Sequence, residues 1–442
     1  MRSDRRPRRS FVLIAVLVVV ALAIFFVTAL LFLVQAERTG DAARRDAARG
    51  RALARSGIER VLVSLDQQRD RILAGDRPRL DEQFVIDETN GRVGVVRLLP
   101  VTPGGERLAP EAAKLDVNDV TVEQLVATKL VEEEIATRIV AWRNAHRPVQ
   151  SIASLLEVRG VTPELLYGPL DRIRPSRDAR GETLGLGDRV GARLSDGASR
   201  GLADVLTVHA AEPALQRDGD RRIPLDVAWS SELERRFERQ SADRTTAVVG
   251  DLLRNDVTDL DRAVRGLRNR GIEPAAWGEI LDQITPTDGI AYGRLDVNAA
   301  PAAALQALPE INEDQAQQIV DARGALPADA RAYPTWLVTE SIVDAERYGA
   351  LAGAVTTRSW TYRVRLAAGE IDPGDAEERI EAPVIYDVVI DLVDPRARIA
   401  YLRDVTDLEL VALLADAASP SEDDDTQGED RSARRSAGSS RG

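Results

Sequence analysis

The chain has 442 residues, a hydrophobic content of 44% and a formal net charge of -13, which together indicate folded domains rather than a disordered chain. The negative charge disfavours nucleic acid and anionic lipid as partners unless basic residues are concentrated in one region. The absence of cysteine excludes a disulfide framework, a thiolate metal site and a cysteine nucleophile.

The N-terminus combines a basic leader with a long apolar run. Residues 1–10 contain five arginines, and residues 11–34 contain no charged side chain. At about 1.5 Å per residue these 24 residues span roughly 36 Å, enough for a hydrocarbon core of about 30 Å. The run is longer than the 7 to 15 apolar residues of a typical cleaved signal. We therefore expect a single transmembrane helix over 11–34, with the leader cytoplasmic and the remaining chain exported.

Residues 35–75 continue with good helix formers, and they carry an apolar stripe at helical spacing. The stripe consists of Leu53, Gly57, Ile58, Val61, Leu62 and Leu65. The sequence predicts one long helix, with its first half in lipid and its second half an amphipathic stalk.

This arrangement resembles the N-terminus of type IV pilins and type II secretion pseudopilins. In those families a peptidase cuts just before a phenylalanine, which corresponds here to the bond between Ser10 and Phe11, although the residue before the cut is usually glycine. The same families usually carry a glutamate at the fifth mature position, and Ala15 stands there in this chain. The K-type minor pseudopilins of type II secretion also lack that acid.

The next segment, 80–113, contains two β-prone runs around Asn90-Gly91, which is a strong hairpin signal. Three further strand-like runs lie in 357–405. We expect these runs to form one antiparallel sheet, split in the sequence by the intervening residues. Residues 419–442 lack apolar side chains and are expected to be a disordered tail.

Between the two parts of this sheet, one sequence pattern occurs twice, 180 residues apart. Its signature is Leu-Asp-Val-Asn, and its members are Leu115, Asp116, Val117 and Asn118 in the first copy and Leu295, Asp296, Val297 and Asn298 in the second. Self-similarity across several elements indicates a repeated supersecondary unit. We place the copies at 114–175 and 291–356, separated by a mixed, mainly helical segment at 176–290. Leu225–Val227 looks like a degraded third opening, but the spacing after it does not match.

Each copy is predicted to hold two helices joined by a short hairpin, and the first begins with a capping box formed by Thr121 and Gln124. The pattern resembles helix-hairpin-helix, or SAM-like, units. Units of this kind that bind DNA place a glycine-rich hairpin against the phosphates. Here the hairpins "TKLVEEE" and "LPEINED" lack glycine and are acidic. We therefore expect no binding to nucleic acid.

The order of anchor, helical repeats and late strands resembles that of the K-type minor pseudopilins, the GspK family, over most of the chain. The resemblance implies an α+β fold: a long N-terminal transmembrane and stalk helix, and a pseudopilin-like antiparallel sheet interrupted by a helical insertion with two helix-hairpin-helix units. It also implies an inner-membrane protein with a periplasmic C-terminal domain. Its expected partners are the other minor pseudopilins, the major pseudopilin and the inner-membrane secretion platform. The expected role is to initiate or cap the type II secretion pseudopilus at its tip.

Two other classes of function remain open. One is a membrane-anchored DNA-uptake receptor of the ComEA type, which also joins an anchor to helix-hairpin-helix units. The other is a membrane-bound hydrolase, for which the sequence offers no nucleophile or metal set, because His146 and His209 lie in no recognisable constellation. No catalytic residue is predicted, and the protein is expected not to be an enzyme.

No cofactor is expected with the exception of calcium, which the resemblance to some GspK heads implies. The candidate ligands surround a Pro-Gly turn, and they are Glu370, Asp372, Asp375 and Glu377. A solvated acidic loop is the alternative interpretation of this segment.

Overall fold

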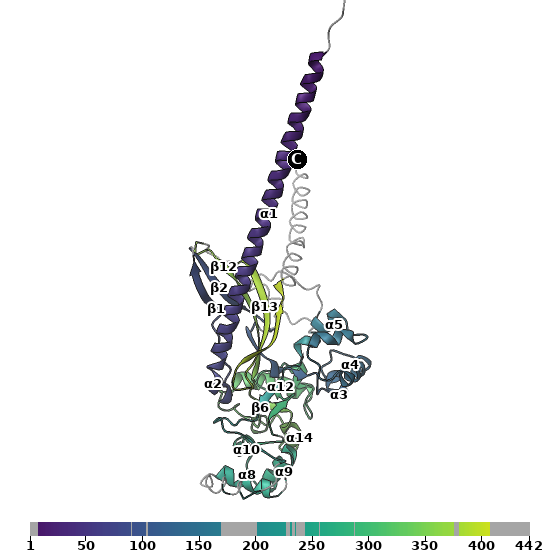
Figure 1. Cartoon of the computed structure of the whole chain (residues 1–442). Coiled ribbons are helices and arrows are strands. Elements are labelled where there is room, and N and C mark those ends of the chain that lie inside the picture. Colours follow the sequence, from purple (N-terminus) through teal and green to yellow (C-terminus); the bar gives the residue numbers. More distant parts are fainter. Residues whose placement is uncertain are drawn as a thin grey trace, which may run out of the picture.

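The structure is a computed structural model of the chain, and it describes residues 8–89, 91–102, 105–168, 201–226, 230–231, 235, 244–255, 257–286, 288–374 and 380–406. Figure 1 shows a long helix, α1, that rises from a head. The head consists of an antiparallel sheet beside the lower half of α1 and a mainly helical region at the end farthest from the helix N-terminus.

Helix α1 (Arg8–Asp66) is continuous over 59 residues, and a short helix α2 (Arg69–Leu73) follows it. Leu53, Ile58, Val61 and Leu65 are buried on the face that the sequence predicted, so the amphipathic stripe is confirmed. A Cβ atom on Gly57 would lie 2.5 Å from Val96 Cγ2, which means that the helix approaches the sheet too closely for a larger residue.

The head sheet has six strands, with the order β1-β2-β12-β13-β14 and with β3 paired to the first part of β12. All pairs are antiparallel. The strands are β1 (Gln83–Thr89), β2 (Arg92–Leu99), β3 (Leu108–Pro110), β12 (Thr361–Ile371), β13 (Glu381–Asp391) and β14 (Arg398–Asp404). The hairpin around residues 90–91 and the split of one sheet by an insertion are both confirmed.

Alternate residues of the central strands point to opposite faces, as the two-residue period of a strand requires. Val96, Leu98 and Leu366 pack with the stalk part of α1 in one apolar cluster. Val95, Leu99 and Ala367 belong to a separate cluster. The stalk and the sheet therefore share a core of their own, distinct from the core of the insertion.

The insertion begins with the 3-10 turn at Glu111–Ala113 and returns to the sheet at β12. Its first unit holds β4 (Leu115–Asp116), α3 (Val122–Ala127), α4 (Glu133–Ala145), a 3-10 segment (Ile152–Glu157) and α5 (Pro163–Tyr167). The predicted capping box is confirmed, because Thr121 Oγ1 accepts from Gln124 N and Gln124 Oε1 accepts from Thr121 N. After the 3-10 turn Leu202–Asp204, strand β5 (Leu206–Thr207) pairs in parallel with β4.

The second unit repeats this plan. It holds β10 (Leu295–Asp296), α11 (Ala302–Leu305), α12 (Glu313–Ala325), α13 (Trp336–Thr339), α14 (Tyr348–Ala352) and β11 (Val355–Thr356). Strands β10 and β11 pair in parallel. In both copies the Leu-Asp of the signature is thus the strand that holds the two ends of the unit together.

A third parallel pair lies in the middle segment, between β7 (Ile223–Pro224) and β8 (Ile284–Thr285). It encloses α8 (Arg244–Arg254), α9 (Leu260–Asn269) and α10 (Pro274–Leu281). The strand of this pair is Ile223–Pro224, so it lies just before the weak match at 225–227 noted in the sequence. A further antiparallel pair, β6 (Ala211–Pro213) with β9 (Ile290–Tyr292), precedes the second unit.

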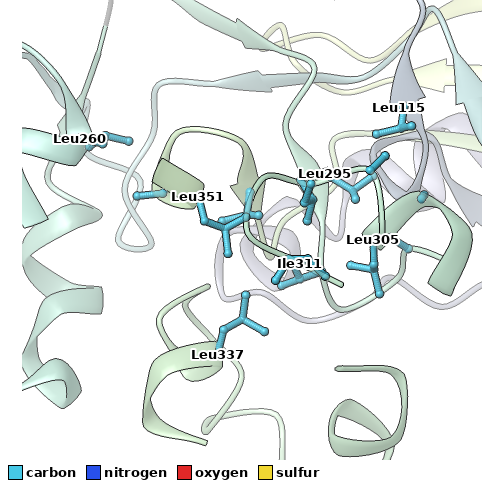
Figure 2. Packing of buried hydrophobic residues seen from close by; sticks show 14 of the residues in the cluster. Leu115, Leu260, Leu295, Leu305, Ile311, Leu337 and Leu351 are labelled. Carbon is cyan, nitrogen blue, oxygen red and sulfur yellow. The ribbon is translucent and has the colours of Figure 1, made fainter. Parts of the chain in front are cut away.

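One hydrophobic core joins all three parts of the insertion. Figure 2 shows Leu115 of the first unit, Leu260 of the middle segment, and Leu295, Leu305, Ile311, Leu337 and Leu351 of the second unit. The insertion is therefore a single packed body rather than a string of separate repeats.

Candidate functional site

The Leu-Asp-Val-Asn signatures are internal clasps that fix each unit. Asp116 Oδ1 accepts from Asn118 N at 2.8 Å, and Asp296 Oδ1 accepts from Asn298 N at 2.9 Å. The asparagine amide then reaches a distant loop: Asn118 exchanges two hydrogen bonds with the backbone of Val149, whereas Asn298 donates to Arg331 O and accepts from Trp336 Nε1. These signature residues hold backbone and loops in place, and Asp296 and Asn298 also line a cleft beside the second unit.

An arginine completes each clasp from the second helix of the unit. Arg143 Nη1 donates to the carbonyl groups of Val117 and Val120, and Arg323 Nη1 donates to those of Val297 and Ala300. Arg143 and Arg323 stand at the same offset in the two copies, 180 residues apart. Each guanidinium thus ties the second helix of its unit to two backbone carbonyls in the loop between the signature strand and the first helix.

Burial raises the pKa values of the two signature aspartates, Asp116 and Asp296. Removal from water raises the pKa of Asp116 to about 6, and the neighbouring Asp119 adds to the shift. Burial also raises the pKa of Asp296, against the hydrogen bond that Ser359 Oγ donates to it at 2.7 Å.

The two hairpins, where related units contact DNA phosphates, are acidic here. Glu132, Glu133 and Glu134 open α4, and Lys129 Nζ forms an ion pair at 2.6 Å with Glu313 at the start of α12. The hairpin cation is therefore engaged by the other unit. Each hairpin also turns through a left-handed residue that is not glycine: Lys129 has φ of 60° and Glu310 has φ of 63°. Their side chains occupy the place that glycine leaves open for a close approach of phosphate to the backbone.

The first half of α1 projects from the head with its apolar side chains uncovered (Figure 1). Exposure lies between 50% and 69% for Leu17, Val20, Leu22, Ile24, Phe25, Phe26, Val27, Leu30, Leu31, Phe32 and Leu33. Consecutive positions such as 24–27 and 30–33 are all exposed, so the helix is apolar around its whole circumference.

A search of the described side chains finds no helix with both the length and the apolar character that a membrane crossing requires. The side chains of Ser10, Phe11 and Ala15 lie outside the described set, although their backbone belongs to α1. The transmembrane span at 11–34 and the cleavage between Ser10 and Phe11 stay predictions. Residues 419–442 also lie outside the described residues.

The structure describes two of the four predicted calcium ligands, Glu370 and Asp372. Glu370 Oε1 accepts from Arg49 Nε at 2.9 Å, and Asp372 Oδ1 accepts from Gly374 N at 2.9 Å. Asp375 and Glu377 lie outside the described residues. Within the described ranges no group of three or more acidic or histidine side chains is arranged to hold a metal ion. Calcium binding stays a prediction, and the ion pair with Arg49 competes with it.

Buried ion pairs attach the insertion to the sheet, and no local sequence pattern predicts them. Glu111 is fully buried and accepts from Arg363 Nε of β12 at 2.7 Å, while Arg363 Nη1 donates to Asp387 of β13 at 2.8 Å. Arg363 and Lys114 hold the pKa of Glu111 well below its usual range, against the opposing effect of burial. A second network joins Glu212 and Asp282 to Arg222, Arg294 and Arg358. A residue separation of 252 between Glu111 and Arg363 hides such a pair from any local pattern.

Comparisons with known proteins agree with parts of this description. Residues 110–170 match a family model described as a helix-hairpin-helix motif, which covers the first unit. No curated protein matches the chain. Among solved structures the chain is similar to the GspK-GspI-GspJ complex from the type 2 secretion system of enterotoxigenic Escherichia coli. That similarity covers 84% of this chain and 98% of the other at 12% identity, with a TM-score of 0.30, so it is weak.

Proposed function

We propose that this protein is a non-enzymatic assembly subunit of the minor pseudopilin type, which initiates or caps a type II secretion pseudopilus at its tip. The observation that carries the proposal is α1, a single helix of 59 residues with two different environments. Its second half is buried against the head sheet, and its first half exposes large apolar side chains along its length. Such a helix joins a folded head to an apolar phase or to other helices.

Water is an unfavourable environment for the exposed half. Burial of one leucine or phenylalanine side chain contributes about 1.5–3 kcal/mol, and eleven large apolar side chains are exposed here. Lipid, followed by the packed helices of neighbouring subunits, supplies the missing burial. With the arginine-rich leader cytoplasmic, we propose a single-pass inner-membrane protein whose head lies in the periplasm.

The shape of the head favours a terminal position in a fibre. The helical insertion lies beyond the sheet, at the end of the molecule farthest from the N-terminus of α1 (Figure 1). A body of that size would collide with subunits stacked above it in a wound shaft, but it is unobstructed at the tip. Ala15 fits the same position, because a tip subunit has no neighbour ahead whose N-terminal ammonium pairs with an acid at that site.

Quantitative mass spectrometry of sheared fibres, together with immunogold labelling, tests the proposal. We expect about one copy per fibre and label at one end only. Label along the shaft, or amounts near those of the major subunit, would contradict the tip position. A reporter fused after Leu413 should also be active outside the cytoplasm, and a cytoplasmic signal would contradict the membrane topology.

A second candidate is a DNA-uptake receptor, which the family match at residues 110–170 favours. The acidic hairpins oppose it, because phosphate neutralisation needs basic side chains. Non-specific DNA-binding proteins reach Kd values of about 10⁻⁴ to 10⁻⁶ M at physiological salt. Binding of duplex DNA by the full-length chain more tightly than that range, with a steep salt dependence, would favour the receptor over the pseudopilin.

A further inference from the structure

A polar cleft of about 510 Å³ lies where the end of the stalk meets the second helical unit. One wall comes from α2 and the chain after it, and the other from the signature of the second unit, the loop after α12 and the start of β12. Six arginines line this arginine cleft, and they are Arg71, Arg77, Arg79, Arg323, Arg331 and Arg358. Its volume falls within the roughly 300–1,000 Å³ of ligand pockets and is far larger than the space that one small ion fills.

The arginines outnumber the acids of the cleft. Three carboxylates line it, Asp76, Glu106 and Asp296, which leaves a formal excess of three positive charges from six arginines. Part of the charge is neutralised internally, since Arg77 Nη1 donates to Glu106 Oε1 at 2.8 Å. Arg323 is directed to backbone carbonyls, and Arg358 Nη2 pairs with Asp282 behind the wall.

Three guanidinium donors around the cleft lack an acceptor. Among the described residues, Arg71 Nε, Arg331 Nε and Arg358 Nη1 are buried nitrogen atoms without a hydrogen-bond partner. An unsatisfied buried donor is costly, and more so when it belongs to a charged group. These groups come from the stalk end, from the second unit and from the start of β12, so an anion in the cleft would be attracted by all three parts at once.

The other side chains that line the cleft favour some kinds of anion over others. Asp76 and Glu106 offer acceptors beside the arginine donors, and the side chains of Asn298, Ser359 and Tyr362 lie in the same walls. A compact doubly charged ion would satisfy the donors only and would be repelled by the carboxylates. An extended peptide has backbone N-H groups for the acceptors and acidic side chains for the guanidinium forks, which match carboxylates geometrically.

We propose that the arginine cleft is a docking site for an acidic segment of a partner polypeptide. The segment would bridge the stalk end and the helical insertion, and its carboxylates would be held by Arg71 and Arg331. This inference does not depend on the pseudopilin assignment, because it rests only on the cleft and its charges.

Binding to the full-length chain in mild detergent, measured by fluorescence anisotropy, tests the proposal. The probe is a labelled decapeptide of alternating aspartate and glutamate, and the same peptide with asparagine and glutamine is its control. We expect saturable binding of the acidic peptide alone. Arg331→Gln and Arg71→Gln should each weaken it at least about tenfold, since one charged hydrogen bond contributes about that much. Arg347→Gln, a substitution of an exposed arginine outside the cleft, should leave it unchanged.

Two further measurements distinguish docking of the peptide from binding of a small anion: a lysine variant and competition by small anions. Arg331→Lys keeps the charge but not the planar fork, and weaker peptide binding by this variant supports docking through guanidinium geometry. Citrate and inorganic phosphate serve as small-anion competitors. Displacement of the peptide by millimolar phosphate, or equal binding by wild type and both glutamine variants with unchanged thermal unfolding, would overturn the proposal in favour of a small-anion site or non-specific attraction.

Discussion

The two helix-hairpin-helix units share one internal plan and differ in what lies against it. In both, an aspartate caps the backbone of an asparagine, and an arginine holds two carbonyls near the next helix. In the described part of the chain, the side-chain hydrogen bonds of Asp116 and Asn118 stay within the first unit, where Asn118 bonds Val149. The second clasp also contacts the head, because Ser359 donates to Asp296 and Arg77 donates to Asn298 O. The two units therefore share one plan, and the second is also part of the joint with the stalk and the sheet.

The largest loss of stability is expected from a substitution at the point where the insertion joins the sheet next to the first unit. Glu111→Ala leaves Arg363 with one carboxylate and Thr207 without its acceptor, in a fully buried place. We expect a loss of about 3–5 kcal/mol in the free energy of unfolding, as for other broken buried ion pairs. Urea unfolding monitored by circular dichroism measures it. Ser359→Ala, at the equivalent joint of the second unit, should cost only about 1.5–3 kcal/mol, and equal losses would contradict this ranking.

The pH dependence of stability tests the burial of the aspartate in the first clasp. The pKa of Asp116 is about 6, above its ordinary value, so the folded state favours the protonated acid. This stabilisation is complete below about pH 4 and is lost as the pH rises through 6. It amounts to up to about 3 kcal/mol at 1.36 kcal/mol per unit. Asp116→Asn should flatten that part of the profile measured by urea unfolding between pH 4 and 8, and identical profiles of variant and wild type would contradict the assignment.

The asparagines of the two clasps offer a matched pair. Asn118→Ala and Asn298→Ala each remove two side-chain hydrogen bonds to a loop, and each should cost about 1–3 kcal/mol in thermal or urea unfolding. Only Asn298→Ala releases Arg331, so it alone should also weaken binding of the acidic peptide. Loss of peptide binding in the Asn118 variant would show that the two clasps are not independent.

The smallest change in stability is expected from substitutions in the hairpins of the two helix-hairpin-helix units. Glu310 and Lys129 have positive φ angles, which glycine adopts without strain. Glu310→Gly and Lys129→Gly should each change stability by about 1 kcal/mol or less, with relief of strain offsetting the greater freedom of the unfolded chain. Differential scanning calorimetry of both variants measures it, and a loss above about 2 kcal/mol in either would mean that its exposed ion pair, with Glu313 or with Arg347, stabilises the fold more than such pairs usually do.

Local sequence patterns correctly predict the parts of the fold that depend on contacts between residues close together in the chain. The hairpin pairing of β1 with β2, the capping box of Thr121 and the stripe from Leu53 to Leu65 each depend on neighbours a few residues away, and each is found in the structure. The parallel pairing of β4 with β5 joins residues about 90 positions apart through two residues each, which leaves no periodic signal. The pairing of β7 with β8 was not predicted for the same reason. The arginine cleft is assembled from several segments far apart in the chain, so its charge excess is invisible in a chain with a net charge of -13.

The insertion leaves and rejoins the sheet at neighbouring positions, since Pro110 of β3 lies opposite Tyr362 of β12. Adjacent strands are about 4.8 Å apart, so the two ends of some 250 residues are separated by little more than the length of one residue. The insertion is therefore a separable module of the head. A short turn from β3 to β12 would close the sheet without it. Any displacement of the insertion acts on two paired strands rather than on a single connecting segment. Exchange of whole insertions between related heads is therefore compatible with an unchanged stalk and sheet.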